Sequence, residues 1–424
     1  MKQQIKTTLF LFVFFASAIA LHCAPKPVLM ADGGVIHRFF DTSPISPSGK
    51  YAAFFRFPYE NRKPRAGDAG KVVVIELASM REVFSVKTRG WETQMGANVQ
   101  WGASDAELFY NDADPKNWDA FAVCLDFKSG KTRRLEGTVF MASPDGKKLV
   151  SHNLKKSRFA QVGYGVVVPD AFVKRNRGLP DDDGIFVTDV PSGKCRLIAS
   201  IRDIWEKSVP SIKEGDPDKL EYYCFQAKWN PQMTRVLATI QWTPIDGGKR
   251  RRAVVTMKPD GSDIRTAITP AQWAAGGHHV NWLPDGERVS MNLNVDGKKG
   301  LEIITAKYDG TDLKKVYDVG SGHPSYHPNG LPFILTDAYA GELPLPDGRS
   351  PIRLINVETQ SEVVAVKTSL PPIVDPEFRV DAHPVWVLGG SAAVYNDTKD
   401  GKRCVYLIDL SEFLKTGKNA RNEK

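Results

Sequence analysis

Trp282-Leu-Pro-Asp-Gly286 is a short turn with an apolar segment on each side, and its pattern recurs along this 424-residue chain. Six further stretches have the same layout: Ile45-Ser-Pro-Ser-Gly49, Trp101-Gly-Ala-Ser-Asp105, Ala142-Ser-Pro-Asp-Gly146, Trp229-Asn-Pro-Gln232, Tyr326-His-Pro-Asn-Gly330 and Trp386-Val-Leu-Gly-Gly390. Self-similarity at a period of about 40–60 residues is typical of blades that bury their faces only against neighbouring blades. Seven copies therefore predict an all-β fold, a single seven-bladed β-propeller.

Each repeat continues into further strand-like segments, such as Lys71-Val-Val-Val-Ile-Glu-Leu77 and Arg403-Cys-Val-Tyr-Leu-Ile-Asp-Leu410. Runs of Val, Ile and aromatic residues separated by Asp-Gly, Ser-Gly and Asn-Gly turns are typical of β-hairpins. The last repeat offers three strands only, and residues 35–39 precede the inner strand expected for the first repeat. Because an open ring would expose strand edges, we expect an N-terminal strand to complete the last blade.

The N-terminal segment differs from the rest of the chain. Two lysines precede the apolar run from residue 8 to residue 21, and Ala18-Ile-Ala20 has the small-x-small pattern of a signal-peptidase site. The run is shorter than the roughly 20 residues that span a membrane. We therefore predict a signal peptide at residues 1–20, a single propeller domain at residues 21–424, a periplasmic or secreted location, and no membrane insertion.

Charge and cysteine content leave several alternatives open. The formal net charge of +8 falls to +6 without the two lysines of the signal peptide, which suits an anionic ligand and equally suits plain solubility. The basic residues are dispersed, and we interpret their one cluster, Lys249-Arg-Arg-Arg252, as a solvated turn, so nucleic acid binding is not expected. Cys124, Cys195, Cys224 and Cys404 fall on predicted strands, as buried thiols or as partners in a disulfide between blades.

Two connections are unusually long, residues 154–183 and residues 339–350. Long loops on a rigid scaffold often carry function. Both follow the second strand of their repeat, so we expect them on the face where the innermost strands begin.

Aligned repeats place one residue at the start of each innermost strand, three positions before the turn. These residues are Thr42, Asn98, Val139, Gln226, His279, His323 and His383. Innermost strands surround a central channel, so equivalent positions converge at its mouth. Three imidazoles and a carboxamide suit a borderline divalent ion such as manganese or zinc. The alternative is that these side chains only hydrogen-bond neighbouring loops.

A second ring of polar residues is expected at the ends of the second strands, on the same face: Arg56, Asn111, Asp112, His152, Asn153, Gln241, Asn292, Asp337, Asn396 and Asp397. Asp and Asn in such places often only cap turns. Together with side chains of the long loops, the ring would surround the channel mouth as a polar, basic funnel for an anionic sugar. The substrate-binding candidates are Arg56, Asn98, Asn111, His152, Arg158, Tyr164 and Asp337.

Four stretches carry a resemblance to a known family: His323-Pro-Ser-Tyr-His-Pro-Asn-Gly330, Ile334-Leu-Thr-Asp337, Asp381-Ala-His-Pro-Val-Trp386 and Asp400-Gly-Lys-Arg-Cys-Val-Tyr-Leu-Ile-Asp409. They resemble bacterial TolB-type propellers and, more narrowly, the seven-bladed oligogalacturonate lyases, most clearly over residues 278–410. The resemblance implies a metal held by histidines and a glutamine, here His323, His383 and Gln226, with manganese favoured over zinc or calcium, and a further histidine as base. One departure is Asp381-Ala-His383, where the family has His-Pro-His, so Asp381 or Gln226 would supply a ligand.

The resemblance implies β-elimination on a uronic-acid-containing glycan, of oligogalacturonate or ulvan type. We expect His279 to act as the base, Tyr339 to protonate the leaving oxygen, and Arg177 or Arg158 to bind carboxylates. The alternative is a non-catalytic TolB-type propeller that binds a protein or a glycan. A Ser/His/Asp hydrolase is disfavoured because no Gly-x-Ser-x-Gly elbow is present, while a glycosidase using Asp112 with Asp337 stays open.

Overall fold

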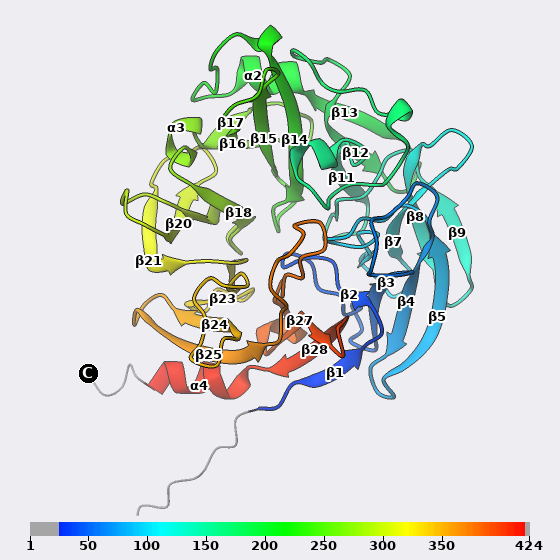
Figure 1. Ribbon diagram of the computed structural model, residues 1–424, viewed down its shortest axis with the longest axis vertical. Helices are drawn as coiled ribbons and strands as arrows, with labels where there is room; N and C mark the ends of the chain where they lie inside the picture. The colour runs from blue at the N-terminus through cyan, green and yellow to red at the C-terminus, as the bar shows by residue number, and fades with distance from the viewer. Residues whose placement is uncertain (1–24, 420–424) are drawn as a thin grey trace, which may run out of the picture.

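Seven four-stranded antiparallel sheets form a ring in the computed structural model, which describes residues 25–419 (Figure 1). The predicted seven-bladed propeller is therefore confirmed. The predicted signal peptide lies outside the described residues. Within the described part of the chain, no helix is long and apolar enough to cross a membrane.

Six blades follow one another along the chain, each built from inner to outer strand. The first three comprise β2 (Val35–Ile36), β3 (Tyr51–Arg56), β4 (Gly70–Glu76) and β5 (Arg81–Thr88); β6 (Gln100–Trp101), β7 (Leu108–Ala113), β8 (Ala120–Asp126) and β9 (Lys131–Arg134); and β10 (Met141–Ala142), β11 (Lys148–His152), β12 (Gly184–Asp189) and β13 (Cys195–Ser200). The next three comprise β14 (Leu220–Trp229), β15 (Val236–Pro244), β16 (Arg251–Met257) and β17 (Arg265–Ile268); β18 (Gly277–Trp282), β19 (Arg288–Leu293), β20 (Leu301–Lys307) and β21 (Lys314–Gly320); and β22 (Ser325–Tyr326), β23 (Phe333–Asp337), β24 (Ser350–Asn356) and β25 (Ser361–Thr368).

The seventh blade joins the two ends of the chain. Its strands β26 (Val385–Val387), β27 (Ala392–Lys399) and β28 (Lys402–Asp409) are completed on the outside by β1 (Val28–Ala31), which pairs antiparallel with β28. This confirms closure by an N-terminal strand. The first repeat differs from expectation, because its innermost strand is β2 rather than the stretch leading to Ile45.

Residues 37–44, between β2 and β3, leave the sheet and pass through the centre of the ring, where the blue trace reaches the channel in Figure 1. Phe39 and Phe40 are fully buried there. Lys228 of β14 pairs with Asp41 at 2.9 Å, and both side chains are almost completely buried. This central segment, residues 37–44, lies in the channel, and a cavity of about 460 Å³ and another of about 410 Å³ share no lining residue.

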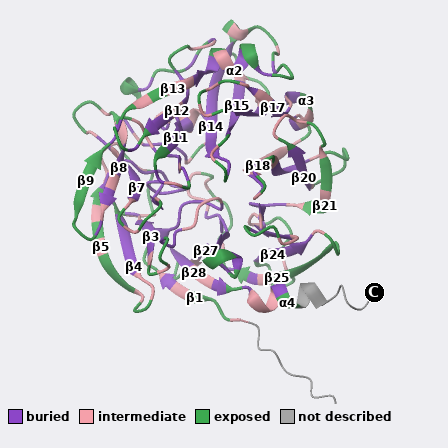
Figure 2. Ribbon diagram, turned by 180° about the vertical axis from the view of Figure 1, so that it is seen from behind, coloured by how far each residue is buried: buried purple, intermediate pink, exposed green. Residues whose placement is uncertain are grey.

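Tryptophans before three of the turns connect neighbouring blades or a blade and the central segment. Three indole N–H groups donate to a backbone oxygen of the preceding blade or of the central segment: Trp101 to Pro44, Trp282 to Lys228 and Trp386 to Ser325, at 2.8, 3.3 and 3.1 Å. A large ring with one donor can fill the space between blades and still have its polar group paired. Inner strands are accordingly buried while outer strands such as β9 and β21 are exposed (Figure 2).

Helices are confined to connections and the C-terminus. They are α1 (Ser157–Ala160), α2 (Ile201–Lys207), α3 (Pro270–Trp273) and α4 (Ser411–Asn419), with 3-10 turns at Asp170–Phe172, Pro217–Lys219 and Leu388–Gly390. Ser200 and Thr269 cap α2 and α3 with reciprocal hydrogen bonds to the third helical residue. The four cysteines of the described chain, at 124, 195, 224 and 404, are free thiols.

Candidate functional site

The ring position at the start of the innermost strands has an unusual backbone. Asn98, Gln226, His279 and His383 all have φ between +46° and +59°, a left-handed conformation that side-chain-bearing residues rarely adopt. The strand pairing slips at the same points in β14 and β18. An irregularity of this kind changes the direction of one side chain without ending the strand. A left-handed backbone conformation therefore sets the direction of the side chain at this position in these four repeats.

The three predicted histidines lie together on the central segment. The ring centroids of His279 and His323 are 4.0 Å apart, and those of His323 and His383 are 4.3 Å apart. Phe39 contacts all three rings, with centroid distances between 4.7 and 6.0 Å. We call His279, His323 and His383 the histidine cluster.

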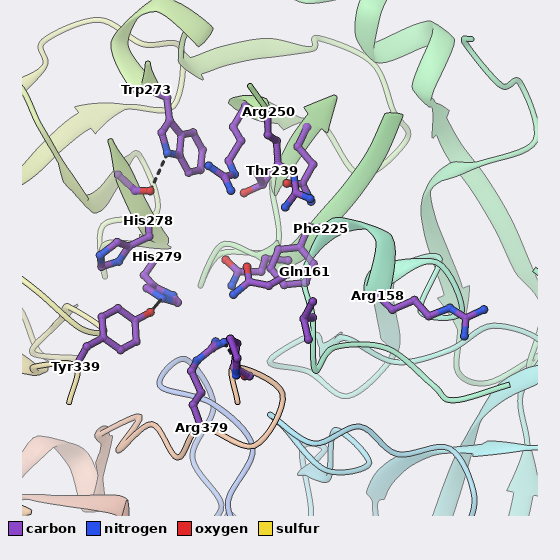
Figure 3. Close-up of a pocket in the computed structure, with 16 residues that line it drawn as sticks. Arg158, Gln161, Phe225, Thr239, Arg250, Trp273, His278, His279, Tyr339 and Arg379 are labelled. Atoms are coloured by element: carbon purple, nitrogen blue, oxygen red, sulfur yellow. Dashed lines mark hydrogen bonds between the residues drawn. The ribbon is translucent and has the colours of Figure 1, made fainter. Parts of the chain in front are cut away.

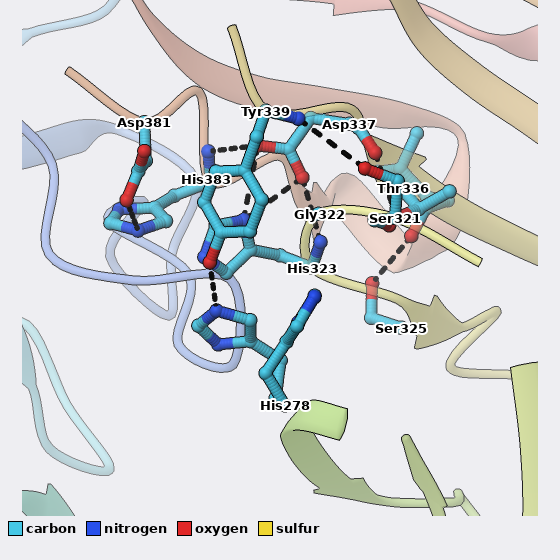
Figure 4. Close-up of polar contacts among 12 residues, drawn as sticks. His278, Ser321, Gly322, His323, Ser325, Thr336, Asp337, Tyr339, Asp381 and His383 are labelled. Atoms are coloured by element: carbon cyan, nitrogen blue, oxygen red, sulfur yellow. Dashed lines mark hydrogen bonds and ion pairs between the residues drawn. The ribbon is translucent and has the colours of Figure 1, made fainter. Parts of the chain in front are cut away.

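Asp337, at the end of β23, orients two members of the histidine cluster (Figure 4). Its carboxylate oxygens lie 2.9 and 3.0 Å from Nδ1 of His323, and it accepts backbone N–H bonds from His323 and His383. Burial acts to raise the pKa of Asp337, but the charge of His323 and its hydrogen bonds lower it below the usual range. An ionised Asp337 accepts from Nδ1–H, so Nε2 of a neutral His323 would carry the free lone pair that a metal ion needs.

His279 and Tyr339 form the second feature of the site. Nε2 of His279 and the hydroxyl of Tyr339 share a short hydrogen bond, and Nδ1 of His279 is buried without a hydrogen-bond partner. Burial, reinforced by the neighbouring histidines, holds the pKa of His279 well below 6.5. Burial also raises the pKa of Tyr339 well above 10. At neutral pH the pair therefore consists of a neutral imidazole, able to accept a proton, and a protonated phenol, able to donate one.

A cluster that could hold a metal ion lies beside this pair. His323, Asp381 and His383 each offer a donor atom, and these atoms lie within 4.8 Å of one another. Nε2 of His323 and both ring nitrogens of His383 are buried without hydrogen-bond partners. Two imidazoles and a carboxylate suit a borderline divalent ion. Asp381 also accepts a 2.8 Å bond from Nε of Arg379, so the carboxylate is held in place by a neighbouring cation.

His279 and Tyr339 lie at the wall of a cavity of about 460 Å³ (Figure 3). Its lining comprises Arg158, Gln161, Val162, Phe225, Gln226, Thr239, Gln241, Arg250, Arg252, Trp273, Gly277, His278, His279, Tyr339, Pro376 and Arg379. Four of these side chains are arginines, and none of the described lining residues carries a carboxylate. An enclosed surface of this kind favours an anionic ligand.

The structure brings some of the predicted site residues together. Gln226, His279, Tyr339 and Arg158 line the cavity, although Arg158 points away from the histidines in Figure 3. Tyr164 lies deeper and accepts a 3.3 Å hydrogen bond from Arg379.

Other predicted site residues lie elsewhere. Arg177 is mostly exposed and faces Glu221 at 3.7 Å, and Arg56 pairs with Glu82 on the outer part of its blade at 2.5 Å. His152 is buried next to Ser157, with 2.9 Å between Nε2 and Oγ, and lines a separate cavity of about 200 Å³. Asn98 accepts a 3.2 Å bond from Arg38. None of these four residues lines the cavity at the histidines.

The second ring of polar residues joins neighbouring blades. The carboxamide of Asn111 exchanges two 2.8 Å hydrogen bonds with the backbone of Val139, at the start of the next blade. Asn396 binds the backbone of His37 in the same way, accepting at 2.9 Å and donating at 3.5 Å. Asn292 donates to the oxygen of Gly322 at 2.8 Å. Asp337 occupies the same position in its own blade. It binds the backbone of His383 at the start of the next blade, as the asparagines bind theirs, and its carboxylate also orients His323.

Sequence reasoning missed three arginines of the cavity. Arg250 and Arg252 belong to the basic cluster that we interpreted as a solvated turn, and they line the cavity instead. Their spacing of two residues is a signal, because alternate residues of a strand share a face. Arg379 comes from the connection before β26, a long segment whose path no local pattern indicates.

No protein-family model matches the chain, and no curated protein matches it by sequence. Solved structures do resemble it. An oligogalacturonate lyase from Vibrio parahaemolyticus is 14% identical, with a TM-score of 0.59 over 91% of this chain and 93% of that one. An oligogalacturonate lyase in complex with manganese gives the same identity and TM-score over 92% and 99% of the two chains. The β-propeller domain of the Trilobed protease from Pyrococcus furiosus is 10% identical, with a TM-score of 0.52 over 88% and 96%. These similarities show the propeller fold.

Proposed function

We propose that this protein is an exported lyase that cleaves uronic-acid-containing oligosaccharides by β-elimination. The observation that carries the proposal is the pairing of His279 with Tyr339 at the wall of a cavity that is lined by four arginines and, among the described residues, by no carboxylate. The likeness to oligogalacturonate lyases supports the same class of reaction. Export rests on the N-terminal sequence of residues 1–20.

The cavity residues supply what this reaction needs. Arginine side chains such as Arg379 bind the substrate carboxylate and favour the charge that develops on it. His279, neutral because burial lowers its pKa, removes the proton alpha to that carboxylate. The electrons of the C–H bond become the new C=C bond while the bond from the β carbon to the glycosidic oxygen breaks. Tyr339, or a water, donates the proton to the departing oxygen.

A divalent ion fits the donor set of His323, His383 and Asp381, with Gln226 as the further ligand expected from the sequence. When bound, such an ion would neutralise the substrate carboxylate and stabilise the enediolate. We favour manganese, with zinc or calcium as alternatives, because imidazole and carboxylate ligands suit it and because one structural neighbour is a manganese complex.

The test is the ultraviolet absorbance of the conjugated product during incubation with uronic-acid oligosaccharides. The wild type with manganese should form product, and chelation should abolish at least nine-tenths of the rate until the ion is restored. His279→Ala should lower the rate at least a hundredfold, whereas Arg265→Gln, a partly exposed ion-pair residue of the same propeller, should not. Absence of absorbance change for the wild type across the whole panel would overturn the lyase.

A second candidate is a propeller that binds an anionic glycan or protein without turnover. Asp381 already pairs with Arg379, so this part of the cluster is balanced in charge without an added ion. In that case His323→Ala and His383→Ala would leave ligand affinity unchanged, and no unsaturated product would form.

A further inference from the structure

A second basic cavity adjoins the histidine site. It has a volume of about 300 Å³ and is lined by Lys249, Arg250, Arg251, Arg252, Pro270, Trp273, Ala274, Ala275 and Gly276. Arg250, Arg252 and Trp273 line this cavity and the larger one alike. The two cavities are therefore neighbouring parts of one groove, which runs from the histidines toward the connection between β15 and β16.

The arginines of the groove differ in their hydrogen-bond and ion-pair partners. Arg251 pairs with Glu214, with 2.8 Å between Nε and the carboxylate. Arg250 instead donates to the backbone oxygens of Ala160 and Phe159. Among the described residues, neither Arg250 nor Arg252 forms an ion pair with a carboxylate. Burial lowers the pKa of both guanidinium groups below the usual range, so the fold keeps two partly desolvated cations without an acidic partner among the described residues. An anion from outside would compensate them.

Trp273 gives the groove an apolar wall. Its indole N–H donates to the oxygen of Gly277 at 2.8 Å, which fixes the ring. The guanidinium of Arg252 lies over the ring, 5.9 Å from its centroid. A rigid aromatic surface next to cations matches a sugar ring that carries a carboxylate, because the ring offers C–H groups and the carboxylate accepts from arginine.

We propose that Lys249, Arg250, Arg252 and Trp273 form a further acid-sugar subsite, which binds the uronic acid unit next to the two units that flank the cleaved bond at the histidines. The inference rests on the proposed function, since it names the substrate that the same site takes. It follows that the protein prefers oligosaccharides of three or more acidic units to the dimer, and free carboxylates to their methyl esters.

The test compares equilibrium binding of saturated uronic acid dimers and trimers, measured by calorimetry on the His279→Ala protein to prevent turnover. The trimer should bind at least tenfold more tightly than the dimer, since a bidentate carboxylate–arginine contact has about this strength. Arg252→Gln and Arg250→Gln should remove the advantage of the trimer, because they should lower the affinity for the trimer more than the affinity for the dimer. Arg265→Gln, which pairs with Asp263 and lines neither cavity, should preserve the advantage.

A second measurement needs no variant of the groove: methyl esterification of the trimer should reduce its affinity to that of the dimer. Equal affinities for dimer and trimer, or an unchanged preference in both arginine variants, would overturn the subsite even if the protein proves to be a lyase. Length-dependent binding that the variants abolish, without product from the wild type, would uphold the subsite and overturn the lyase.

Discussion

A single residue distinguishes the blade junction at the histidine cluster from the other blade junctions. Asn111, Asn292 and Asn396 use carboxamides to bind the start of the next blade. Asp337 makes the corresponding contact with a carboxylate that also holds Nδ1 of His323. The sequence predicted this polar ring but assigned it to substrate, because strand position alone does not indicate which neighbour a side chain binds.

Asp337→Asn should separate the two roles of this residue. The backbone N–H groups of His323 and His383 donate to different oxygens of the carboxylate, and the single carboxamide oxygen can accept from only one of them. The melting temperature should therefore fall only modestly, through the loss of one hydrogen bond. A neutral amide no longer holds His323 as a carboxylate does, and orienting partners of this kind are worth about 10–100-fold in activity or metal affinity. We therefore expect a loss of this size in both, measured by product absorbance and by manganese titration. A fully active variant would contradict the role given to Asp337.

His152 should contribute to the dependence of stability on pH. Burial lowers its pKa from 6.5 to about 3. The unfolded chain therefore binds a proton at His152 below pH 6.5 that the folded protein takes up only near pH 3. The free energy of unfolding should fall in this window as the pH falls, by up to about 1.4 kcal/mol per pH unit for this one group.

His152→Gln removes this titration and keeps a hydrogen-bonding group for Ser157. Urea unfolding between pH 5 and pH 8 should show a shallower slope for the variant below pH 6.5 and parallel curves above it. Identical slopes below pH 6.5 would show that His152 is protonated in the folded protein.

At the scale of elements, the central segment packs against the histidine cluster. Residues 37–44 bring Phe39 and Phe40 under the histidine cluster and Asp41 next to Lys228. No feature of the sequence predicted this path, because residues 35–39 look like an ordinary strand and leave the sheet only after Ile36. The positions of the cavity arginines were missed for a related reason, since connections between strands follow contacts that are distant in sequence.

Lys228→Met tests the central segment. It leaves the buried Asp41 with Arg38 as its remaining cation, and removal of one partner from a buried ion pair costs about 3–5 kcal/mol. The free energy of unfolding should fall by about this amount in urea, and Asp41→Asn added to Lys228→Met should recover part of it. The exposed pair Lys194–Glu136 is the control, since solvent screens its charges and Lys194→Met should change the free energy of unfolding far less. Equal losses at the two positions would contradict a structural role for the buried pair.

At the scale of the whole molecule, the repeat predicted most of the architecture. Seven similar turns indicated seven blades, and equivalent positions in a ring must converge, which is why His279, His323 and His383 could be found without a structure. The same symmetry does not indicate which blades carry chemistry. Which blades contribute residues to the site depends on how the arginines, the central segment and the connection before β26 pack at one end of the channel.

The most direct test of the account is the mass of the products formed from a uronic acid trimer. Elimination adds no water, so the masses of the fragments should sum to the mass of the substrate, and one fragment should carry the new double bond. Fragments that together exceed the substrate by one water would show hydrolysis, as paired carboxylates such as Asp112 and Asp337 would perform. Either that result or an intact trimer would contradict the proposed lyase.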